Sequence, residues 1–163
     1  MSDVTSPMPA AGEAAPAFSG TSQTGDTVAL ADFCGAPLAL YFYPKDDTPG
    51  CTKQACSLRD GWAELRAAGI AVVGVSPDDV ASHERFAEKY DLPFPLLADP
   101  DKQVLGVYGA WGEKNLYGRK SMGVKRTTFL IDGDGIVRHV FKRPDTKAHA
   151  DQILGKARDL GLV

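Results

Sequence analysis

A strand-like run that leads through a short loop into a helix start is the feature that most restricts how this chain can fold. Residues 37–43, PLALYFY, are almost all apolar, as expected for a central strand covered on both faces. After Pro44 and a polar loop, Thr48-Pro49-Gly50 predicts a helix start, because threonine is a good N-cap and proline suits the first turn. Cys51 is therefore expected in the first turn, where free backbone N–H groups and the helix dipole favour a thiolate over a thiol.

The rest of the sequence alternates between strand and helix patterns. Residues 17–33 hold short strand-like pieces around the turn signal Thr24-Gly25-Asp26, and Gly133-Asp134-Gly135 predicts a later hairpin. Between and after these signals the patterns predict a helix at 52–68, a strand at 70–75, a helix at 80–90, a strand at 94–97, a helix at 101–108, strands at 127–132 and 136–141, and a closing helix at 148–160.

This order of elements predicts an α/β fold with a mixed central β-sheet flanked by helices and an N-terminal β-hairpin. Early strand–helix alternation favours parallel pairing with right-handed crossovers, whereas the late hairpin favours antiparallel strands at one side. The Pro/Ala-rich residues 1–15 are expected to form a loose tail, and residues 16–163 a single domain, since the sequence shows no internal repeat and no domain linker.

Charge and hydropathy argue against two classes of partner. The net charge of -3 gives no signal for a polyanion, so nucleic acid is not an expected partner. No apolar run approaches the ~20 residues of a membrane span. The first 15 residues carry no Lys or Arg and no apolar segment of the kind found in secretory signals, so we expect a cytoplasmic protein.

The three cysteines are too few for a disulfide scaffold and point to catalysis or sensing instead. Cys34 lies in Asp32-Phe33-Cys34-Gly35, where nothing suggests activation, and we expect it to be a small buried hydrophobic residue. Cys51 has a polar, proline-framed context at a helix start. Cys56 follows five residues later in the same predicted helix.

Other ionisable residues are interpreted as structural. His83, His139 and His149 are distant in sequence from both Cys51 and Cys56, and we expect them to be surface or capping residues. The acidic pairs Asp46-Asp47 and Asp78-Asp79 are interpreted as loop or first-turn charges. With three scattered cysteines and no CxxC pair, neither a zinc site nor another cofactor is expected.

Several stretches together resemble the peroxiredoxins, which are thiol peroxidases without metal or haem. The motif Pro44-x-x-x-Thr48-x-x-Cys51 looks like their active-site motif, and the Cys51-x4-Cys56 pair resembles the peroxiredoxin Q subgroup, also called bacterioferritin comigratory proteins. Three further stretches agree, at residues 40–45, 111–114 and 126–132. The resemblance covers the chain from about Phe18 to the last helix, and it implies a thioredoxin-like fold.

The resemblance also implies the roles of the site residues. Cys51 would be the peroxidatic cysteine and Cys56 the resolving one, with Thr48 and Arg126 completing the site and Pro44 shielding it. The Arg126 guanidinium would stabilise the thiolate and donate to the peroxide oxygens, and the Thr48 hydroxyl would orient the peroxide. From the residues alone, Arg126 could equally be a solvated charge at a strand end.

The implied activity is the reduction of hydrogen peroxide and organic hydroperoxides. Cys51 would become a sulfenic acid, Cys56 would condense with it to form a disulfide, and thioredoxin or a similar dithiol protein would reduce that disulfide. Position 54, often acidic in the wider family, is Gln54 here. No cysteine follows Cys56 in this sequence, so we do not expect a resolving thiol from a C-terminal arm of a partner subunit. We expect a monomer, or at most a weak dimer.

Two alternatives come from other classes. A thiol–disulfide oxidoreductase on the same fold normally carries a CxxC motif, which this chain lacks. A non-enzymatic redox sensor or chaperone-like binding protein could use the same disulfide as a switch. Stoichiometry separates these readings, because a peroxidase consumes many equivalents of peroxide when a reductant is present and a sensor consumes only one.

Overall fold

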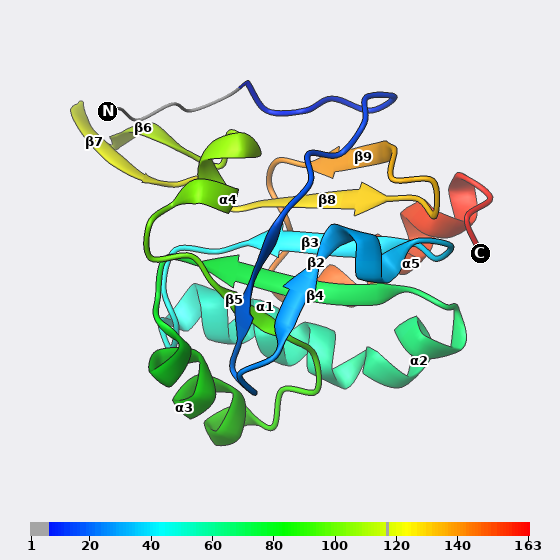
Figure 1. Ribbon diagram of the computed structural model, residues 1–163, viewed down its shortest axis with the longest axis horizontal. Coiled ribbons are helices and arrows are strands. Elements are labelled where there is room, and N and C mark those ends of the chain that lie inside the picture. The colour runs from blue at the N-terminus through cyan, green and yellow to red at the C-terminus, as the bar shows by residue number, and fades with distance from the viewer. Residues whose placement is uncertain (1–6, 117) are drawn as a thin grey trace.

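The computed structural model describes residues 7–116 and 118–163. In chain order its elements are β1 (Ser19–Ser22), β2 (Thr27–Ala29), the 3-10 helix η1 (Leu30–Phe33), β3 (Leu38–Phe42), α1 (Pro49–Asp60), α2 (Trp62–Ala67), β4 (Ala71–Ser76), α3 (Val80–Tyr90), β5 (Leu96–Ala98), α4 (Gln103–Val107), β6 (Trp111–Leu116), β7 (Arg119–Val124), β8 (Thr127–Ile131), β9 (Val137–Phe141) and α5 (His149–Asp159) (Figure 1). No described helix has the length and apolar character required to cross a bilayer.

Seven strands form one mixed sheet in the order β2-β1-β5-β4-β3-β8-β9. Strands β3, β4 and β5 are parallel, as the alternation of strands and helices predicted. Strand β8 is antiparallel to β3, and β9 to β8. The β1/β2 hairpin is antiparallel and joins the sheet through β5. The prediction of a mixed sheet with helices and an N-terminal hairpin is therefore confirmed.

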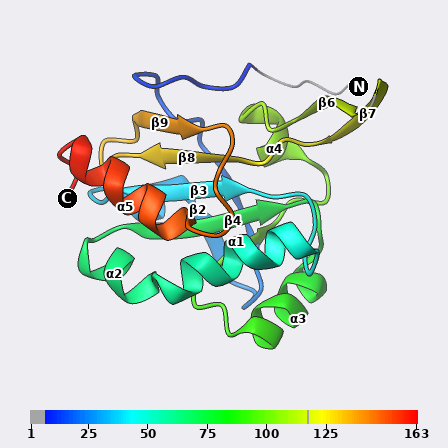
Figure 2. The same cartoon turned by 180° about the vertical axis from the view of Figure 1, so that it is seen from behind.

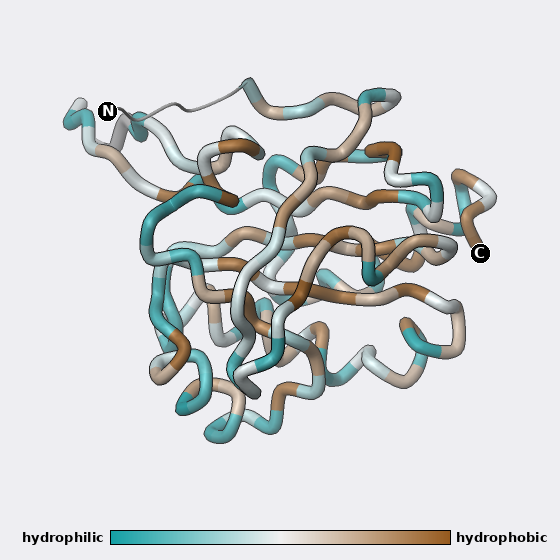
Figure 3. Tube along the Cα trace, in the orientation of Figure 1, coloured by the Kyte–Doolittle hydropathy of each residue, from teal (hydrophilic) through white to brown (hydrophobic). Residues whose placement is uncertain are grey.

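Strand β3 is buried along its whole length because each of its faces packs against a separate apolar cluster. Ala39 and Tyr41 belong to the cluster shared with α1, α3 and α5, whereas Leu40 and Phe42 belong to the cluster shared with α4. Figure 2 shows α1, α2 and α5 together on one side of the sheet, and Figure 1 shows α4 on the other side. Hydrophobic segments accordingly concentrate in the central strands (Figure 3).

The helix predicted over residues 52–68 is two helices, α1 and α2, which meet at Gly61. A Cβ atom at Gly61 would lie 2.4 Å from the Cβ atom of Ala150 in α5. Only glycine permits this close approach, and the side-chain periodicity used for the prediction gives no sign of it. The single-helix prediction was therefore wrong at Gly61, where the close packing of α5 requires glycine.

Two further features differ from the predictions. Strands β6 and β7 form a separate two-stranded sheet that the sequence patterns did not indicate. Residues 12–15, expected to belong to a loose tail, are paired with the chain near β9. Gly12 donates its backbone N–H to the Val137 carbonyl at 2.7 Å, and Ala15 donates to the Gly135 carbonyl at 2.8 Å. The tail expectation is wrong for these residues.

Candidate active site

The site forms where the carboxyl end of β3 passes through residues 44–48 into α1. Thr48 has the extended backbone of an N-cap, Pro49 is the first residue of α1, and Cys51 lies in the first turn as predicted. The Cys51 side chain is buried, at 1% exposure. The thiol therefore occupies the positive end of the α1 dipole, in surroundings where water screens charges weakly.

The register between β3 and β8 brings Arg126 to this helix start. Thr127 pairs with Phe42, so the residue before β8 lies at the carboxyl end of β3. From there the Nη2 of Arg126 donates to the Cys51 Sγ at 3.3 Å. Gly50 makes room for this approach, because a Cβ atom there would lie 3.1 Å from the Arg126 Nη2. The Arg126 side chain is thus half-buried and contacts the sulfur.

Gln54 completes the contacts of the guanidinium. Its Oε1 accepts from Arg126 Nη1 at 2.6 Å, and its side chain is fully buried one turn after Cys51. Among the described residues, no carboxylate lies within ion-pair distance of Arg126. The positive charge of the guanidinium is therefore directed at the sulfur and is not cancelled by an acidic neighbour. The sequence singled out Gln54 only as a departure from the family pattern, and its helical spacing of three from Cys51 was the signal that could have placed it at the site.

Two buried polar atoms near this contact have no hydrogen-bond partner among the described residues, the Tyr41 hydroxyl and Gln54 Nε2. The Gln54 amide cannot be flipped to help, because its oxygen must face the Arg126 donor. Burial and, after it, the charge of Cys51 raise the pKa of Tyr41 well above its ordinary value, so this hydroxyl stays protonated. Both groups keep donors available at the buried side of the site.

The other three site residues predicted from the resemblance have different surroundings. Thr48 donates its hydroxyl to the Lys45 carbonyl at 2.8 Å and makes no side-chain cap of α1. Pro44 is half-buried and follows β3 by two residues. Cys56 is half-buried further along α1, and it is a free thiol like Cys51. Cys51 and Cys56 thus lie in one helix, as predicted.

Cys34 is exposed, so the expectation of a buried residue was wrong. It follows η1, at the end of β3 opposite to Cys51, and lines a cavity of about 380 Å³ together with Phe18 and Phe33. The lining residues of this cavity include none from segment 41–56 and do not include Arg126. The cavity is therefore separate from the thiol site.

Two histidines expected at the surface are fully buried, which corrects that prediction for His83 and His149. His139 is half-buried on β9. The burial of His149 follows from partners on other elements, since its Nε2 lies 2.8 Å from the Thr128 hydroxyl oxygen and its Nδ1 lies 2.9 Å from Gln152 Oε1. Burial lowers the pKa of His149 to about 4, so the ring is neutral near pH 7.

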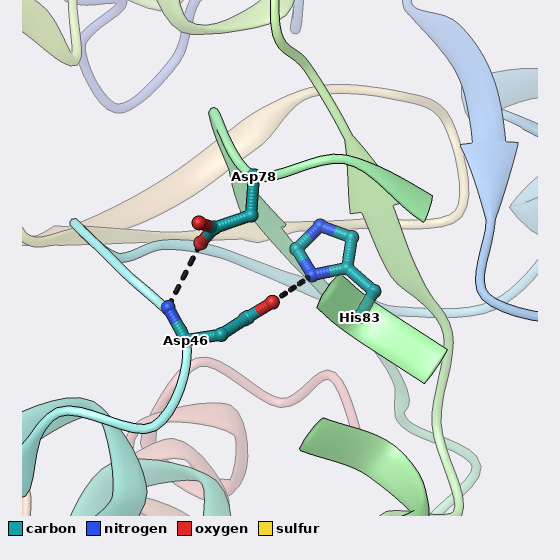
Figure 4. Close-up of side chains that lie close together, drawn as sticks. All are labelled: Asp46, Asp78 and His83. Carbon is teal, nitrogen blue, oxygen red and sulfur yellow. Dashed lines mark hydrogen bonds and ion pairs between the residues drawn. The ribbon is translucent and has the colours of Figure 1, made fainter. Parts of the chain in front are cut away.

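Asp46 is also buried, although it was interpreted as a loop charge. Asp46, Asp78 and His83 have carboxylate and imidazole atoms within 4.8 Å of one another. Figure 4 shows the three side chains close together. Carboxylate and imidazole groups are common metal ligands, so the composition of this cluster is that of a metal site. Both Asp46 carboxylate oxygens, Asp78 Oδ2 and both His83 ring nitrogens already take part in hydrogen bonds with the protein. We therefore interpret the three residues as a hydrogen-bonded cluster.

These contacts define a class of site. A buried thiol at a helix N-terminus, with a guanidinium donor at the sulfur and a second thiol in the same helix, is a nucleophilic and redox-active cysteine centre. The cysteine lies beside the carboxyl end of a central strand in a mixed sheet. This position is typical of thiol enzymes with a thioredoxin-like fold.

Comparison with known proteins gives the family. Residues 11–140 match the model of the AhpC/TSA family. Peroxiredoxin Bcp from Escherichia coli (strain K12) is 49% identical over 144 residues, which are 88% of this chain and 92% of that protein. A cysteine-to-serine mutant of Xanthomonas campestris peroxiredoxin Q superposes with a TM-score of 0.82 at 34% identity, covering 88% of this chain and 91% of that chain.

The chain therefore belongs to the AhpC/TSA family, within the group of peroxiredoxin Q and bacterioferritin comigratory proteins, and it is a thiol peroxidase. The thioredoxin-like fold implied by the resemblance is confirmed. One further solved structure, with a TM-score of 0.82 and 33% identity over 88% of this chain and 91% of its own, is the Xanthomonas campestris bacterioferritin comigratory protein described for its alkyl peroxide reduction activity.

Proposed function

We propose that this thiol peroxidase reduces hydrogen peroxide and organic hydroperoxides through a Cys51 sulfenic acid and a Cys51–Cys56 disulfide. The Cys51 thiolate attacks one peroxide oxygen, the O–O bond breaks, and the other oxygen leaves as hydroxide or alkoxide and takes up a proton. Cys56 then attacks the sulfenic sulfur, and the disulfide forms with release of water. A thioredoxin-type dithiol reduces this disulfide by exchange and is itself oxidised.

The observation that carries the proposal is the 3.3 Å contact between Arg126 Nη2 and Cys51 Sγ at the N-terminus of α1. Two sources of positive charge meet there at one buried sulfur, which favours the nucleophilic thiolate. The same guanidinium can donate to the oxygen that gains charge as the O–O bond breaks. The Thr48 hydroxyl and the Pro44 ring would orient and shield the peroxide, roles for which their loop positions are suitable.

The alkyl peroxide reduction described for the Xanthomonas campestris protein supports organic hydroperoxides as substrates here. The other expectations from the sequence belong to the same proposal. The protein would act in the cytoplasm, because recycling needs a reducing compartment, and as a monomer or at most a weak dimer. The segment 41–60 holds no CxxC pair, which speaks against a dedicated thiol–disulfide oxidoreductase.

A coupled assay tests the function. NADPH oxidation is followed with thioredoxin and thioredoxin reductase, using hydrogen peroxide or a bulky organic hydroperoxide. Wild type should consume many equivalents of each peroxide, and Cys51→Ser should abolish turnover. Cys34→Ser is the matched control, because Cys34 is exposed and lies at the other end of β3, and it should retain nearly full activity. Substantial turnover by Cys51→Ser, or a single equivalent consumed by wild type, would contradict the peroxidase mechanism.

A further inference from the structure

The loop that precedes Cys51 is attached to α3 through two consecutive aspartates. Asp46 accepts hydrogen bonds from the Tyr43 hydroxyl at 2.6 Å and from the Ser82 hydroxyl at 2.8 Å, and its Oδ2 lies 2.7 Å from His83 Nδ1. Its backbone N–H donates to Asp78 at 2.8 Å (Figure 4). Because Asp46 and His83 are both buried, water does not compete for these bonds.

The hydrogen bonds of His83 require that His83 and Asp46 share one proton. The Nε2 of His83 lies 3.0 Å from the Leu97 carbonyl, which can only accept, so Nε2 carries a hydrogen. Nδ1 has two contacts, with Asp46 Oδ2 at 2.7 Å and with the Tyr43 hydroxyl at 3.4 Å. Because that hydroxyl donates to Asp46 Oδ1 at 2.6 Å, the contact between Nδ1 and Asp46 Oδ2 holds one shared proton. Whether that proton resides on nitrogen or oxygen, the contact is a hydrogen bond, and α3 is joined through it to the loop.

Asp47 extends the attachment along the same helix. Its carboxylate accepts from Lys89 Nζ and from the Tyr90 hydroxyl, each at 2.8 Å. Its backbone has φ 58°, in the left-handed region that a non-glycine residue adopts at a cost. The chain direction between Asp46 and Thr48 is therefore set by contacts with α3, and α1 begins directly after it.

We propose that His83 is a positioning residue for the peroxide reaction, acting through Asp46 on the loop that presents Thr48 and the first turn of α1. Neither His83 nor Asp46 touches the sulfur in this arrangement. The pair holds the backbone that leads into Cys51, so the peroxide meets the thiolate at a defined distance and angle. This role rests on the proposed function, because it concerns the peroxide step of the same site.

A matched pair of variants separates the bond to Asp46 from the bond to Leu97. The amide nitrogen of asparagine takes the place of imidazole Nδ1, so His83→Asn keeps a donor for Asp46 and loses the one for Leu97. The amide nitrogen of glutamine takes the place of Nε2, so His83→Gln keeps the donor for Leu97 and loses the one for Asp46. Each variant removes one hydrogen bond, and we expect similar losses of thermal stability.

The readout is bisubstrate kinetics, in which the peroxide and the reductant steps are measured separately. For His83→Gln we expect kcat/KM for hydrogen peroxide to fall at least about tenfold, because a misplacement of ~1 Å is able to cost ~100-fold. His83→Asn should stay within about threefold of wild type, since the loop remains attached. The kcat/KM for the dithiol reductant should be unchanged in both variants.

A second pair asks the same question from the loop. In Asp46→Asn the amide oxygen can accept from Tyr43, and the amide nitrogen can donate to an unprotonated His83 Nδ1, so peroxide reactivity should be retained. Asp46→Ala removes the side-chain bonds of Asp46 to Tyr43, Ser82 and His83, and peroxide reactivity should fall as it does in His83→Gln. If His83→Gln does not fold, the two Asp46 variants test whether the bond between Asp46 and His83 supports the peroxide step.

Asp99→Asn is the control for general destabilisation. Asp99 is a buried carboxylate that accepts from the backbone of Gln103, Val104 and Leu105 at the start of α4, and it has no contact with residues 44–51 among its described hydrogen bonds. It should lower stability and leave the peroxide step unchanged. Equal rates for the asparagine and glutamine variants of His83, or a peroxide step that follows stability in all variants, would overturn the proposal. Wild-type turnover and the inactivity of Cys51→Ser, measured in the same assay, test the peroxidase function itself.

Discussion

At the scale of single residues, the Arg126 guanidinium divides its donors between a sulfur and a neutral amide oxygen. One nitrogen contacts Cys51 and the other contacts Gln54, whose amide fixes the orientation of the planar group without cancelling its charge. A carboxylate in place of this amide would pair with Arg126 and weaken its attraction for the thiolate. The neutral side chain at position 54 thus leaves the full positive charge for Cys51.

Replacing Arg126 by lysine should separate charge from geometry. Lysine keeps a positive charge, but its single nitrogen cannot contact both Cys51 and Gln54 in a fixed plane. We expect kcat/KM for hydrogen peroxide to fall roughly 100-fold, the scale seen when one donor to a developing oxyanion is removed. Stopped-flow measurement of the peroxide step and the ultraviolet absorbance of the thiolate are the tests. A lysine variant with the wild-type rate and thiolate fraction would show that the planar fork is not needed.

His149 should make the stability of the protein depend on pH. Its pKa is about 4 in the folded protein, below the ordinary 6.5, so the unfolded chain binds a proton in this range that the folded protein does not. The stability that neutral His149 contributes is fully present above pH 6.5, and it is lost as the pH drops towards 4. At ~1.36 kcal/mol for each pH unit, the loss attributable to His149 reaches about 3 kcal/mol.

Urea unfolding of wild type and His149→Asn across this pH range measures the effect. Asparagine keeps a donor for Gln152 but does not titrate, so the difference in unfolding free energy between the two proteins should shrink as the pH falls. A difference that stays constant from pH 7 to 4 would mean that the folded protein accommodates a protonated His149.

At the scale of elements, α1 cannot stay intact when Cys51 and Cys56 form a disulfide. In an α-helix, Cα atoms five residues apart are ~8–9 Å from each other, and their side chains point about 140° apart around the axis. A disulfide needs Cα atoms roughly 4.4–6.8 Å apart. Because the structure places both cysteines within Pro49–Asp60, the turns between them must unwind to bring the two sulfurs together.

Hydrogen exchange on the reduced and oxidised protein should reveal this unwinding. Amides of Ser57 and Leu58 bond to carbonyls in the first turns of α1, so they should lose protection on oxidation. The amides of α3, to which Asp46 is hydrogen-bonded, should stay protected in both states. Equal protection of α1 in both states, with the disulfide confirmed by mass spectrometry, would mean that the pairing is different.

Across the whole molecule, the elements with strong local sequence signals were predicted correctly. Predictions were wrong for features that depend on contacts between residues far apart in the sequence. The apolar run of β3 and the periodicity of α3 are local, and both elements lie where they were expected. The close packing of Gly61 against α5, the burial of His83 and the exposure of Cys34 depend on contacts that no short window of sequence contains. The approach of Arg126 to Cys51 depends on the β3–β8 register, and only the family resemblance pointed to it.

The exposed apolar side chains of the described surface favour a monomer, or at most a weak dimer. Large exposed apolar side chains are few and scattered over α4, β7 and the C-terminus, namely Val107, Met122 and Val163. A stable dimer buries ~1,200–2,000 Å² with an apolar centre, which such a surface does not offer. Sedimentation velocity at micromolar concentration should give a single species near 17.4 kDa. A concentration-independent dimer would show that another part of the surface is self-complementary.

The distance along the chain between Cys51 and Arg126 has a consequence for biosynthesis. The two residues that meet at the sulfur are 75 positions apart, and β8, which carries the arginine to the site, is the neighbour of β3 on its far side from β4. At translation rates of about 5–20 residues per second, Cys51 is made ~4–15 s before Arg126. A nascent chain on the ribosome therefore holds this cysteine without its guanidinium, and the site that we propose for peroxide reduction is complete only when the later strand has emerged.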